Sequence, residues 1–236
     1  MSTHHLIVAM SPADPGLRDE LNHTARRLGA DLAFLQIGTP SLGTALTRLA
    51  DGGAERIVLV ALTTSRLSPG VSWLRRIADA WWREHGAQAP EVATASRLFR
   101  SLPELEVLWE QAIATATPVR GTGPGLRSDA WESVPGHRHQ VLVCRGPRCT
   151  AAGAEQTTEA LVLELMRHEL GDDDVLITHT GCQFPCNHAP VLSVQPDDVW
   201  YGRVDADAAR EIVDTHLRTG VPAGRNRLPR TPAQQG

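Results

Sequence analysis

Cysteine is absent from the first 143 of the 236 residues. The four cysteines of the chain form two close pairs after that point, Cys144 with Cys149 and Cys182 with Cys186. A reducing compartment keeps scattered thiols from pairing, so thiols concentrated in this way favour an inorganic centre over disulfide bonds. We therefore expect an iron–sulfur or zinc site in the second half of the chain.

The sequence lacks several other features as well. No apolar run approaches the roughly 20 residues that span a bilayer, and residues 1–5 lack the cationic region and cleavage site of a signal peptide. The net charge of −4 gives no general attraction to nucleic acid or anionic lipid. The glycines form no phosphate-binding fingerprint. These absences predict a cytoplasmic protein that binds neither nucleic acid nor a membrane.

The first half of the chain alternates strand-like and helix-like segments. The strand candidates are compact apolar runs at residues 4–10, 31–37 and 55–63, as buried parallel strands tend to be. Helical periodicity covers residues 16–28, 41–51, 71–85 and 104–117. This alternation predicts an α/β domain, residues 1–118, built on a doubly wound parallel sheet.

A stretch without periodicity follows this domain. Residues 119–136 are rich in glycine and proline, and we interpret them as a linker. A second domain, residues 137–222, follows; its predicted strands are at 140–143, 174–178, 191–194 and 199–204, and its predicted helices at 154–170 and 206–217. Residues 223–236 carry several arginines and prolines, and we expect a disordered tail there.

Both cysteine pairs fall in loops at strand ends. The first pair follows the strand at 140–143, and the second lies between the strands at 174–178 and 191–194. Loops at the tips of one sheet can converge on one site, where glycines permit close approach and free amides can point at sulfur. Zinc sites most often have two residues between paired ligands, whereas the gaps here are four and three. Wider gaps favour a 2Fe-2S cluster, and zinc or disulfides remain the alternatives.

The residues around the cysteines resemble a known family. The segments are Val-Leu-Val-Cys-Arg-Gly-Pro-Arg-Cys at 141–149, Gly-Cys-Gln-Phe-Pro-Cys-Asn-His-Ala-Pro-Val at 181–191 and Val-Trp-Tyr-Gly-Arg-Val at 199–204. They are similar to the thioredoxin-like 2Fe-2S ferredoxins over about residues 138–220. The resemblance implies a thioredoxin-like fold and a 2Fe-2S cluster with four ligands, Cys144, Cys149, Cys182 and Cys186.

Other polar residues lie beside the two pairs. His179 and His188 flank the second pair, and histidine ligands raise the potential of Rieske-type centres. Because four cysteines already complete a cluster, we expect all-thiolate ligation. Arg145 and Arg148 could bring positive charge near an anionic cluster, but we interpret them as ordinary solvated loop charges.

The first domain resembles a second family. The segments Gly-Ala-Asp-Leu-Ala-Phe-Leu-Gln-Ile-Gly-Thr-Pro-Ser-Leu at 29–42 and Gly-Ala-Glu-Arg-Ile-Val-Leu-Val-Ala-Leu at 53–62 are similar to the small class II chelatases that insert cobalt or iron into sirohydrochlorin. The resemblance implies a parallel sheet flanked by helices and a tetrapyrrole ligand. Those enzymes use a histidine after the first strand and another after the third, where this chain has Met10 and Ser72. A thioether is a weak ligand and a serine hydroxyl a poor base, so we assign no catalytic residue.

Three functional hypotheses follow. The first is a redox protein that carries or senses an electron, with a degenerate chelatase-like domain for docking or ligand binding, linked to sirohaem or cobalamin metabolism. The alternative is an active sirohydrochlorin cobalto- or ferrochelatase with an appended iron–sulfur domain, and the third is a structural cluster in a binding protein. We favour the first, because it explains the intact cysteines and the lost histidines together. Its candidate partners are a redox protein, a tetrapyrrole and a second copy of the chain.

Overall fold

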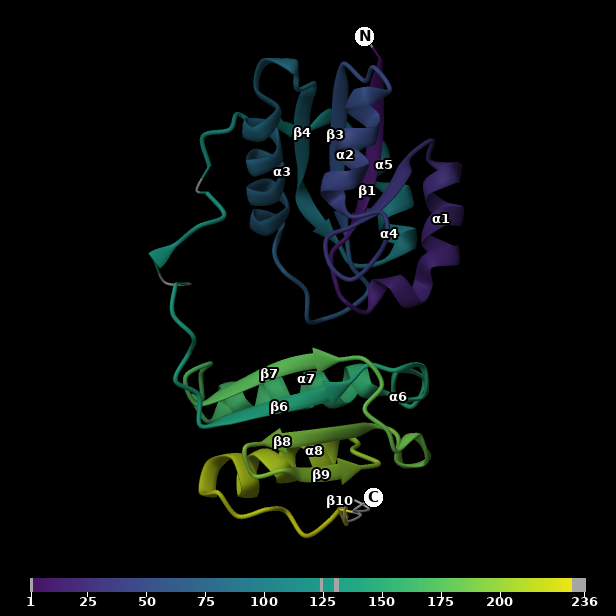
Figure 1. The fold of residues 1–236 in the computed structure, drawn as a ribbon. Helices are drawn as coiled ribbons and strands as arrows, with labels where there is room; N and C mark the ends of the chain where they lie inside the picture. Colours follow the sequence, from purple (N-terminus) through teal and green to yellow (C-terminus); the bar gives the residue numbers. More distant parts are fainter. Residues whose placement is uncertain (1, 124, 130–131, 231–236) are drawn as a thin grey trace, which may run out of the picture. The chain divides into compact units, whose positions relative to one another are not determined.

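The chain forms two compact units, each with its own sheet. The computed structural model describes residues 2–123, 125–129 and 132–230, and the units are Met1–Glu132 and Ser133–Gly236 (Figure 1). The division lies inside the predicted linker. None of the described helices is long and apolar enough to cross a bilayer.

The first unit is a five-stranded sheet in the order β2-β1-β3-β4-β5. Strands β1 to β4 are parallel, and the short β5 is antiparallel to β4. The strands are β1 (Thr3–Ala9), β2 (Asp31–Phe34), β3 (Arg56–Leu62), β4 (Glu91–Phe99) and β5 (Thr117–Pro118). The helices are η1 (Asp14–Leu17), α1 (Arg18–Arg27), α2 (Leu42–Asp51), α3 (Val71–His85), η2 (Gly86–Gln88), α4 (Leu102–Val107) and α5 (Trp109–Ala114).

Side chains of β1 alternate between two cores, which explains the apolar run in the sequence. Leu6 and Val8 pack with residues of α2 and α3 on one face of the sheet. Ile7 and Ala9 pack with residues of α1, α4 and α5 on the other face. Both faces are therefore covered by helices, as a buried parallel sheet requires. The predicted α/β fold with a largely parallel sheet is confirmed.

Two segments of the first unit differ from the sequence-based expectation. Strand β4 was not predicted, because polar residues interrupt its apolar pattern, and its pairing with β3 makes it a strand. Residues 119–123, assigned to the linker, pack on this unit. The Val119 amide donates to the Val92 carbonyl at 2.7 Å, and the buried Asp79 carboxylate on α3 accepts from the amides of Gly121 and Gly123 at 2.9 and 2.7 Å.

The second unit is a mixed five-stranded sheet in the order β10-β9-β8-β6-β7. Only β6 and β7 are parallel, and the other neighbours are antiparallel. The strands are β6 (His139–Cys144), β7 (Val175–Thr180), β8 (Val191–Gln195), β9 (Val199–Gly202) and β10 (Arg227–Leu228). The helices are α6 (Pro147–Ala151), α7 (Ala154–Arg167), η4 (Cys186–His188), α8 (Ala206–Ile212) and the π-helical η5 (Val213–Leu217).

One face of this sheet carries the core. Val141 and Val143 of β6 lie opposite Val194 and Leu192 of β8, and all four pack with residues of α7 and α8. Figure 1 shows both helices on the same side of the sheet.

The predicted disordered tail, residues 223–236, is wrong for residues 223–230. Ala223 is buried, and its amide donates to the Tyr201 hydroxyl at 3.0 Å. Arg227 and Leu228 then pair with β9 as strand β10. Two paired residues leave no periodic signal in a sequence, which explains the error. Residues 231–236 lie outside the described residues.

Candidate metal centre

The first cysteine pair is positioned by the end of β6 and the start of α6. Cys144 is the last residue of β6, and Cys149 lies within the short helix that begins at Pro147. Both side chains are buried, with 1% exposure. The intervening Arg145 donates to Glu155 of α7 at 2.6 Å, so its charge is neutralised by that carboxylate.

The second pair lies in the loop that joins β7 to β8. Cys182 is exposed and Cys186 is half-buried. Their sulfur atoms lie 3.4 Å apart. Gln183 holds this loop to the sheet, because its side-chain amide donates to the Leu142 carbonyl at 2.9 Å and accepts from the Ser193 hydroxyl at 3.2 Å.

The two cysteine loops touch each other. A Cβ atom added at Gly146 would lie 3.0 Å from Cys182 Cβ, so only glycine leaves room for this approach. The Cys144 thiol interacts with the thiol of Cys149 and with that of Cys182. Cys182 in turn contacts Cys186. The structure thus places the two predicted cysteine pairs next to each other, with Cys182 in contact with both pairs.

Backbone amides point at two of these sulfur atoms. The Phe184 amide donates to Cys182 and lowers the pKa of that thiol, with a smaller contribution from Cys186. The Val191 amide donates to Cys149, although burial, followed by the Cys144 thiol, raises the pKa of Cys149 to about 11. Amide donors stabilise thiolates and anionic metal–sulfur centres. An all-sulfur donor set with amide donors therefore fits a 2Fe-2S cluster.

Apolar residues surround the inner part of the site. Ala154 and Val191 pack against the buried Cys144 and Cys149, and Ala189 and Trp200 complete this small cluster. The outer part is polar. Arg148 is exposed, and the Cys182 thiol raises the pKa of Cys186, with the charge of Arg148 as a smaller opposing contribution.

The two flanking histidines have different surroundings. Burial, followed by the charge of Arg145, lowers the pKa of His179 on β7. His188 lies at the end of η4, where its carbonyl accepts from the Arg203 amide at 2.6 Å.

The candidate positions of the first unit do not form a comparable site. Met10 is fully buried in a core, and Ser72 is exposed at the start of α3. Between the ends of β1 and β3 lies a residue that the sequence analysis missed, the buried Asp14. Its carboxylate accepts from the Ser11 amide at 2.7 Å and from the amide and hydroxyl of Thr64 at 3.1 and 3.0 Å. Asp14 thus ties the two loops together.

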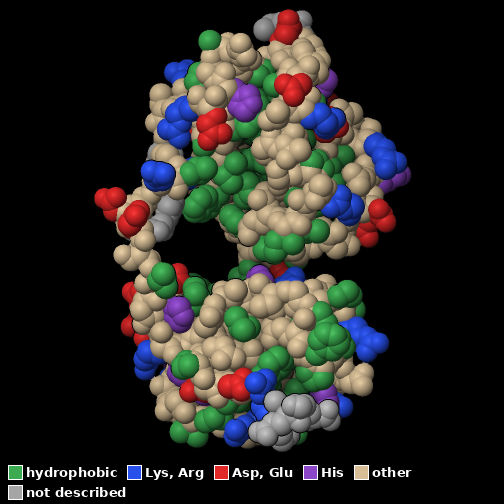
Figure 2. Space-filling view, viewed as in Figure 1, with side chains coloured by type: hydrophobic (Ala, Val, Ile, Leu, Met, Phe, Trp, Pro, Cys, Tyr) green, Lys and Arg blue, Asp and Glu red, His purple; other side chains and the backbone are tan. Residues whose placement is uncertain are grey.

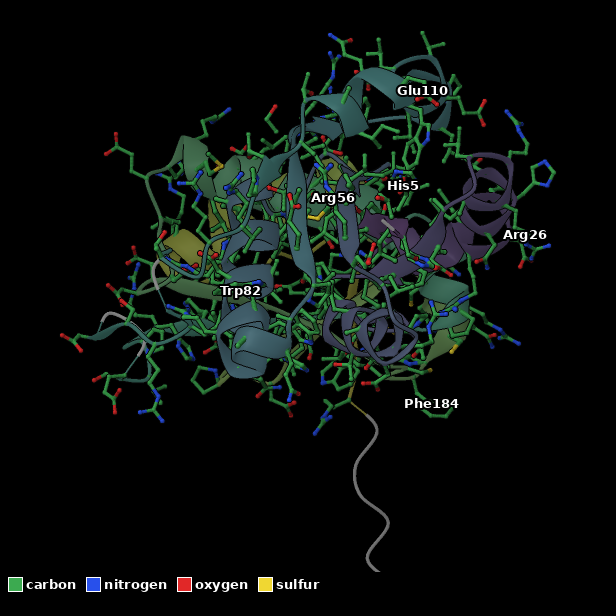
Figure 3. The ribbon with its side chains drawn as sticks, turned by 90° about the horizontal axis from the view of Figure 1, so that it is seen from above. His5, Arg26, Arg56, Trp82, Glu110 and Phe184 are labelled. Carbon is green, nitrogen blue, oxygen red and sulfur yellow. The ribbon has the colours of Figure 1, made fainter. Side chains whose placement is uncertain are left out.

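Histidines of the first unit pack against tryptophans. The ring of His5 lies edge-on to Trp109, with ring centres 5.6 Å apart, and burial lowers the pKa of His5. Figure 3 labels His5 between Arg56 and Glu110, whose charges act on it in opposite directions. His85 stacks on Trp81 with ring centres 4.0 Å apart. These contacts are structural.

The sequence analysis also missed a group in the second unit. Ligand atoms of Glu164, His168 and Asp214 lie within 4.8 Å of one another. Arg167 pairs with Glu164 at 3.1 Å, and Arg218 with Asp214 at 3.6 Å. The two arginines balance the carboxylates, as expected for an ion-pair network between α7 and η5.

The second unit is similar to known proteins. The model of the family described as thioredoxin-like 2Fe-2S ferredoxin matches residues 129–217. A 2Fe-2S ferredoxin from Clostridium pasteurianum is 32% identical over 91 residues, which are 35% of this chain and 88% of the relative. The crystal structure of the thioredoxin-like 2Fe-2S ferredoxin from Aquifex aeolicus matches with 32% identity and a TM-score of 0.36, over 39% of this chain and 97% of the ferredoxin.

A further match is a crystal structure from Marinobacter aquaeolei VT8, described as that of a cobalamin (vitamin B12) biosynthesis CbiX protein. It has 18% identity and a TM-score of 0.33, and covers 48% of this chain and 94% of that protein. The ferredoxin matches are the closer in sequence, and the family that they represent implies a 2Fe-2S cluster. Through its second unit, the chain belongs to the thioredoxin-like 2Fe-2S ferredoxin family.

Proposed function

We propose that the second unit holds a 2Fe-2S cluster on Cys144, Cys149, Cys182 and Cys186 and serves in electron transfer. The observation that carries this proposal is the meeting of two thiol pairs from separate loops, with amides directed at two of the sulfur atoms. A bound 2Fe-2S cluster would supply one-electron chemistry.

The burial of the four cysteines gives the site an inner and an outer side. Cys144 and Cys149 are sealed by Ala154 and Val191, which exclude water from the inner side. Cys182 is exposed on the outer side. A redox partner would therefore approach the outer loop.

We propose that the first unit is a binding or docking module linked to tetrapyrrole metabolism, without chelatase activity. The link to tetrapyrroles rests on the sequence resemblance at residues 29–42 and 53–62, and three observations argue against chelatase activity. The Met10 thioether is fully buried and so is not accessible to a metal ion. Ser72 offers only a hydroxyl. The Asp14 carboxylate already accepts three hydrogen bonds, so it is poorly placed to accept the pyrrole protons that metal insertion releases.

The cluster proposal is tested by purifying the whole chain without oxygen. We expect brown protein with about two iron and two sulfide per chain, and a paramagnetic signal after reduction with dithionite. Cys149→Ser and Cys182→Ser should each lose most of the iron. Thr150→Ala is the matched control, because this exposed hydroxyl adjoins Cys149 and bonds only to the Arg145 carbonyl within the described contacts. Colourless protein with stoichiometric zinc would refute the proposal.

The chelatase alternative has its own test. The purified chain is mixed with sirohydrochlorin and cobalt or ferrous ion, and insertion is followed by absorbance. We expect a rate equal to the uncatalysed control. A rate well above the control would overturn the proposal that the first unit only binds.

A further inference from the structure

An aromatic side chain stands in solvent beside the cysteines. Phe184 lies between Cys182 and Cys186 and is 73% exposed. Figure 3 shows it projecting away from the strands. Aromatic residues are enriched in protein–protein interfaces, where burying one contributes strongly to affinity. Phe184 is therefore suited to contact a partner at the outer side of the site.

A hollow of about 400 Å³ lies where the second cysteine loop meets β9 and β10. Its lining includes His188, Arg203, Arg225, Asn226 and Arg227. The three arginines are exposed. The Arg203 amide bonds to the His188 carbonyl at 2.6 Å, which fastens the cysteine loop to the edge of the hollow.

A short series of backbone contacts links this hollow to the sulfur atoms. The Val191 amide donates to Cys149, and Val191 pairs with Gly202 across β8 and β9. Gly202 donates to the Asn226 carbonyl at 2.9 Å. Because neighbouring strands lie about 4.8 Å apart, the hollow is only a few strand spacings from the cysteines.

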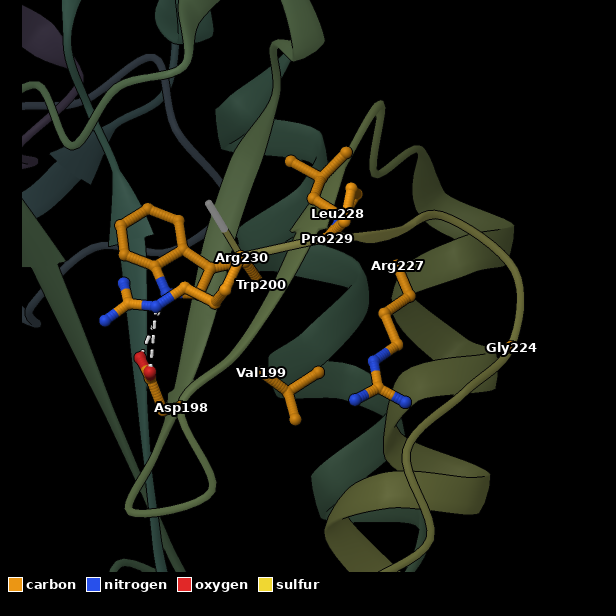
Figure 4. Close-up of a pocket in the computed structure, with 8 residues that line it drawn as sticks. All are labelled: Asp198, Val199, Trp200, Gly224, Arg227, Leu228, Pro229 and Arg230. Carbon is orange, nitrogen blue, oxygen red and sulfur yellow. Dashed lines mark hydrogen bonds and ion pairs between the residues drawn. The ribbon is translucent and has the colours of Figure 1, made fainter. Parts of the chain in front are cut away.

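Little negative charge opposes these arginines. Arg225 lies 3.9 Å from Asp205, a long contact between exposed groups. Among the described residues, no ion pair is found for Arg203 or Arg227. Arg227 also borders a second hollow of about 490 Å³, where Arg230 pairs with Asp198 at 2.9 Å (Figure 4). In Figure 2, several blue side chains are visible low in the view, on the second unit.

We propose that the surface formed by the second cysteine loop and the neighbouring arginines is a docking face for an acidic redox protein. Phe184 is its apolar anchor. Its positively charged residues are Arg148, Arg203, Arg225 and Arg227. The proposal rests on the proposed cluster. The chain as a whole carries a net charge of −4, so a cationic face at the cysteines orients an acidic partner toward them. Arginine and aromatic residues together are the usual composition of interface hot spots.

The first test uses small oxidants of opposite charge. The reduced protein is mixed by stopped flow with hexacyanoferrate(III), which is anionic, or hexaamminecobalt(III), which is cationic, and each takes one electron. Arg225→Glu combined with Arg227→Glu should slow the anionic reaction about tenfold at low ionic strength and speed the cationic one. The effect should fall below about twofold at 0.5 M salt, since such salt screens exposed charges.

The matched control is Arg138→Glu combined with Arg218→Glu, which changes the net charge equally. Arg138 precedes β6, at the end opposite Cys144, and Arg218 follows η5. This variant should react as the unchanged protein does. Equal effects of the two double variants would overturn the proposal, because net charge alone would then explain them.

The second test needs no bound cluster. A fluorescein-labelled peptide of glutamate pairs separated by leucines is titrated with the whole chain, and binding is followed by anisotropy. The Arg225/Arg227 variant should lose salt-dependent binding, whereas Phe184→Ser should weaken binding about equally at all salt concentrations. If the chain bound the peptide but contained no iron after anaerobic purification, the docking face would be supported and the cluster proposal would fail. Absence of binding by the unchanged protein would overturn the docking face, whatever the iron content.

Discussion

The close approach of the two cysteine loops at Gly146 makes a sharp prediction. In Gly146→Ala, the new Cβ would lie 3.0 Å from Cys182 Cβ and 3.1 Å from Cys182 Cα. Carbon atoms pack best at about 3.5–4.0 Å, so the loops must separate by about half an ångström. The two atoms that the new Cβ approaches are the Cα and Cβ of Cys182, and no side-chain rotation moves either of them away.

The expected cost follows from that separation. Overpacking of this kind destabilises by about 1–3 kcal/mol. One kcal/mol lowers the Tm of a domain of this size by about 4–8 °C. Metal sites tolerate ligand displacements of only about 0.5 Å, so we also expect iron loss to a ferrous chelator to become about tenfold faster. Calorimetry of the whole chain and the absorbance of the iron–chelator complex measure the two effects.

Gly181→Ala is the matched control, because Gly181 adjoins Cys182 in the same loop and an added Cβ meets nothing within 4 Å. It should leave both the Tm of the second unit and the rate of iron loss nearly unchanged. If Gly146→Ala behaved like Gly181→Ala in both measurements, the contact between the loops would not set the geometry of the site.

Two other predictions concern stability. Asp14→Ala leaves three hydrogen-bond donors without their buried acceptor, including the amide and the hydroxyl of Thr64. In urea unfolding, it should lower the free energy of unfolding of the first unit by about 3 kcal/mol or more. A loss no larger than that caused by Asp19→Ala, at an exposed position, would contradict this. Burial lowers the pKa of His216, although Asp197 at 3.0 Å opposes the shift. The unfolded chain therefore takes up the proton first, and the second unit should lose stability as the pH falls below about 6.5, by at most about 1.4 kcal/mol per pH unit. Urea unfolding between pH 5.5 and 7.5 should show a smaller slope for His216→Gln, and an equal slope would count against it.

Local patterns in the sequence were enough to predict much of the fold. The apolar run at 55–63 became β3, and the amphipathic pattern at 71–85 became α3 with the same bounds. These segments could be predicted because their side chains repeat with the period of the element that they form. The loops at strand ends could also be predicted, and with them the expectation that the two cysteine pairs meet.

Other elements depend on partners far away in the chain. Strand β4 contains Thr94, Ser96 and Arg97, so its own pattern is ambiguous, and its ladder with β3 decides its conformation. Residues 119–123 look like a flexible linker, but the Asp79 carboxylate fixes two of their amides. Such contacts join residues at least 35 positions apart, and no short window of sequence contains both partners.

The candidate site, like the fold, could be predicted only in part from the sequence. The amino-acid sequence alone singled out the four cysteines to which we assign the proposed cluster, because sulfur is rare in this chain and its spacing survives in any fold. Only the tertiary structure decided that Gly146 lets one loop touch Cys182, that amides face two of the sulfur atoms, and that three arginines line one hollow with His188 of the second cysteine loop. These distances depend on how segments distant in the sequence pack together. That packing is determined by the whole unit, so no local segment of sequence specifies it.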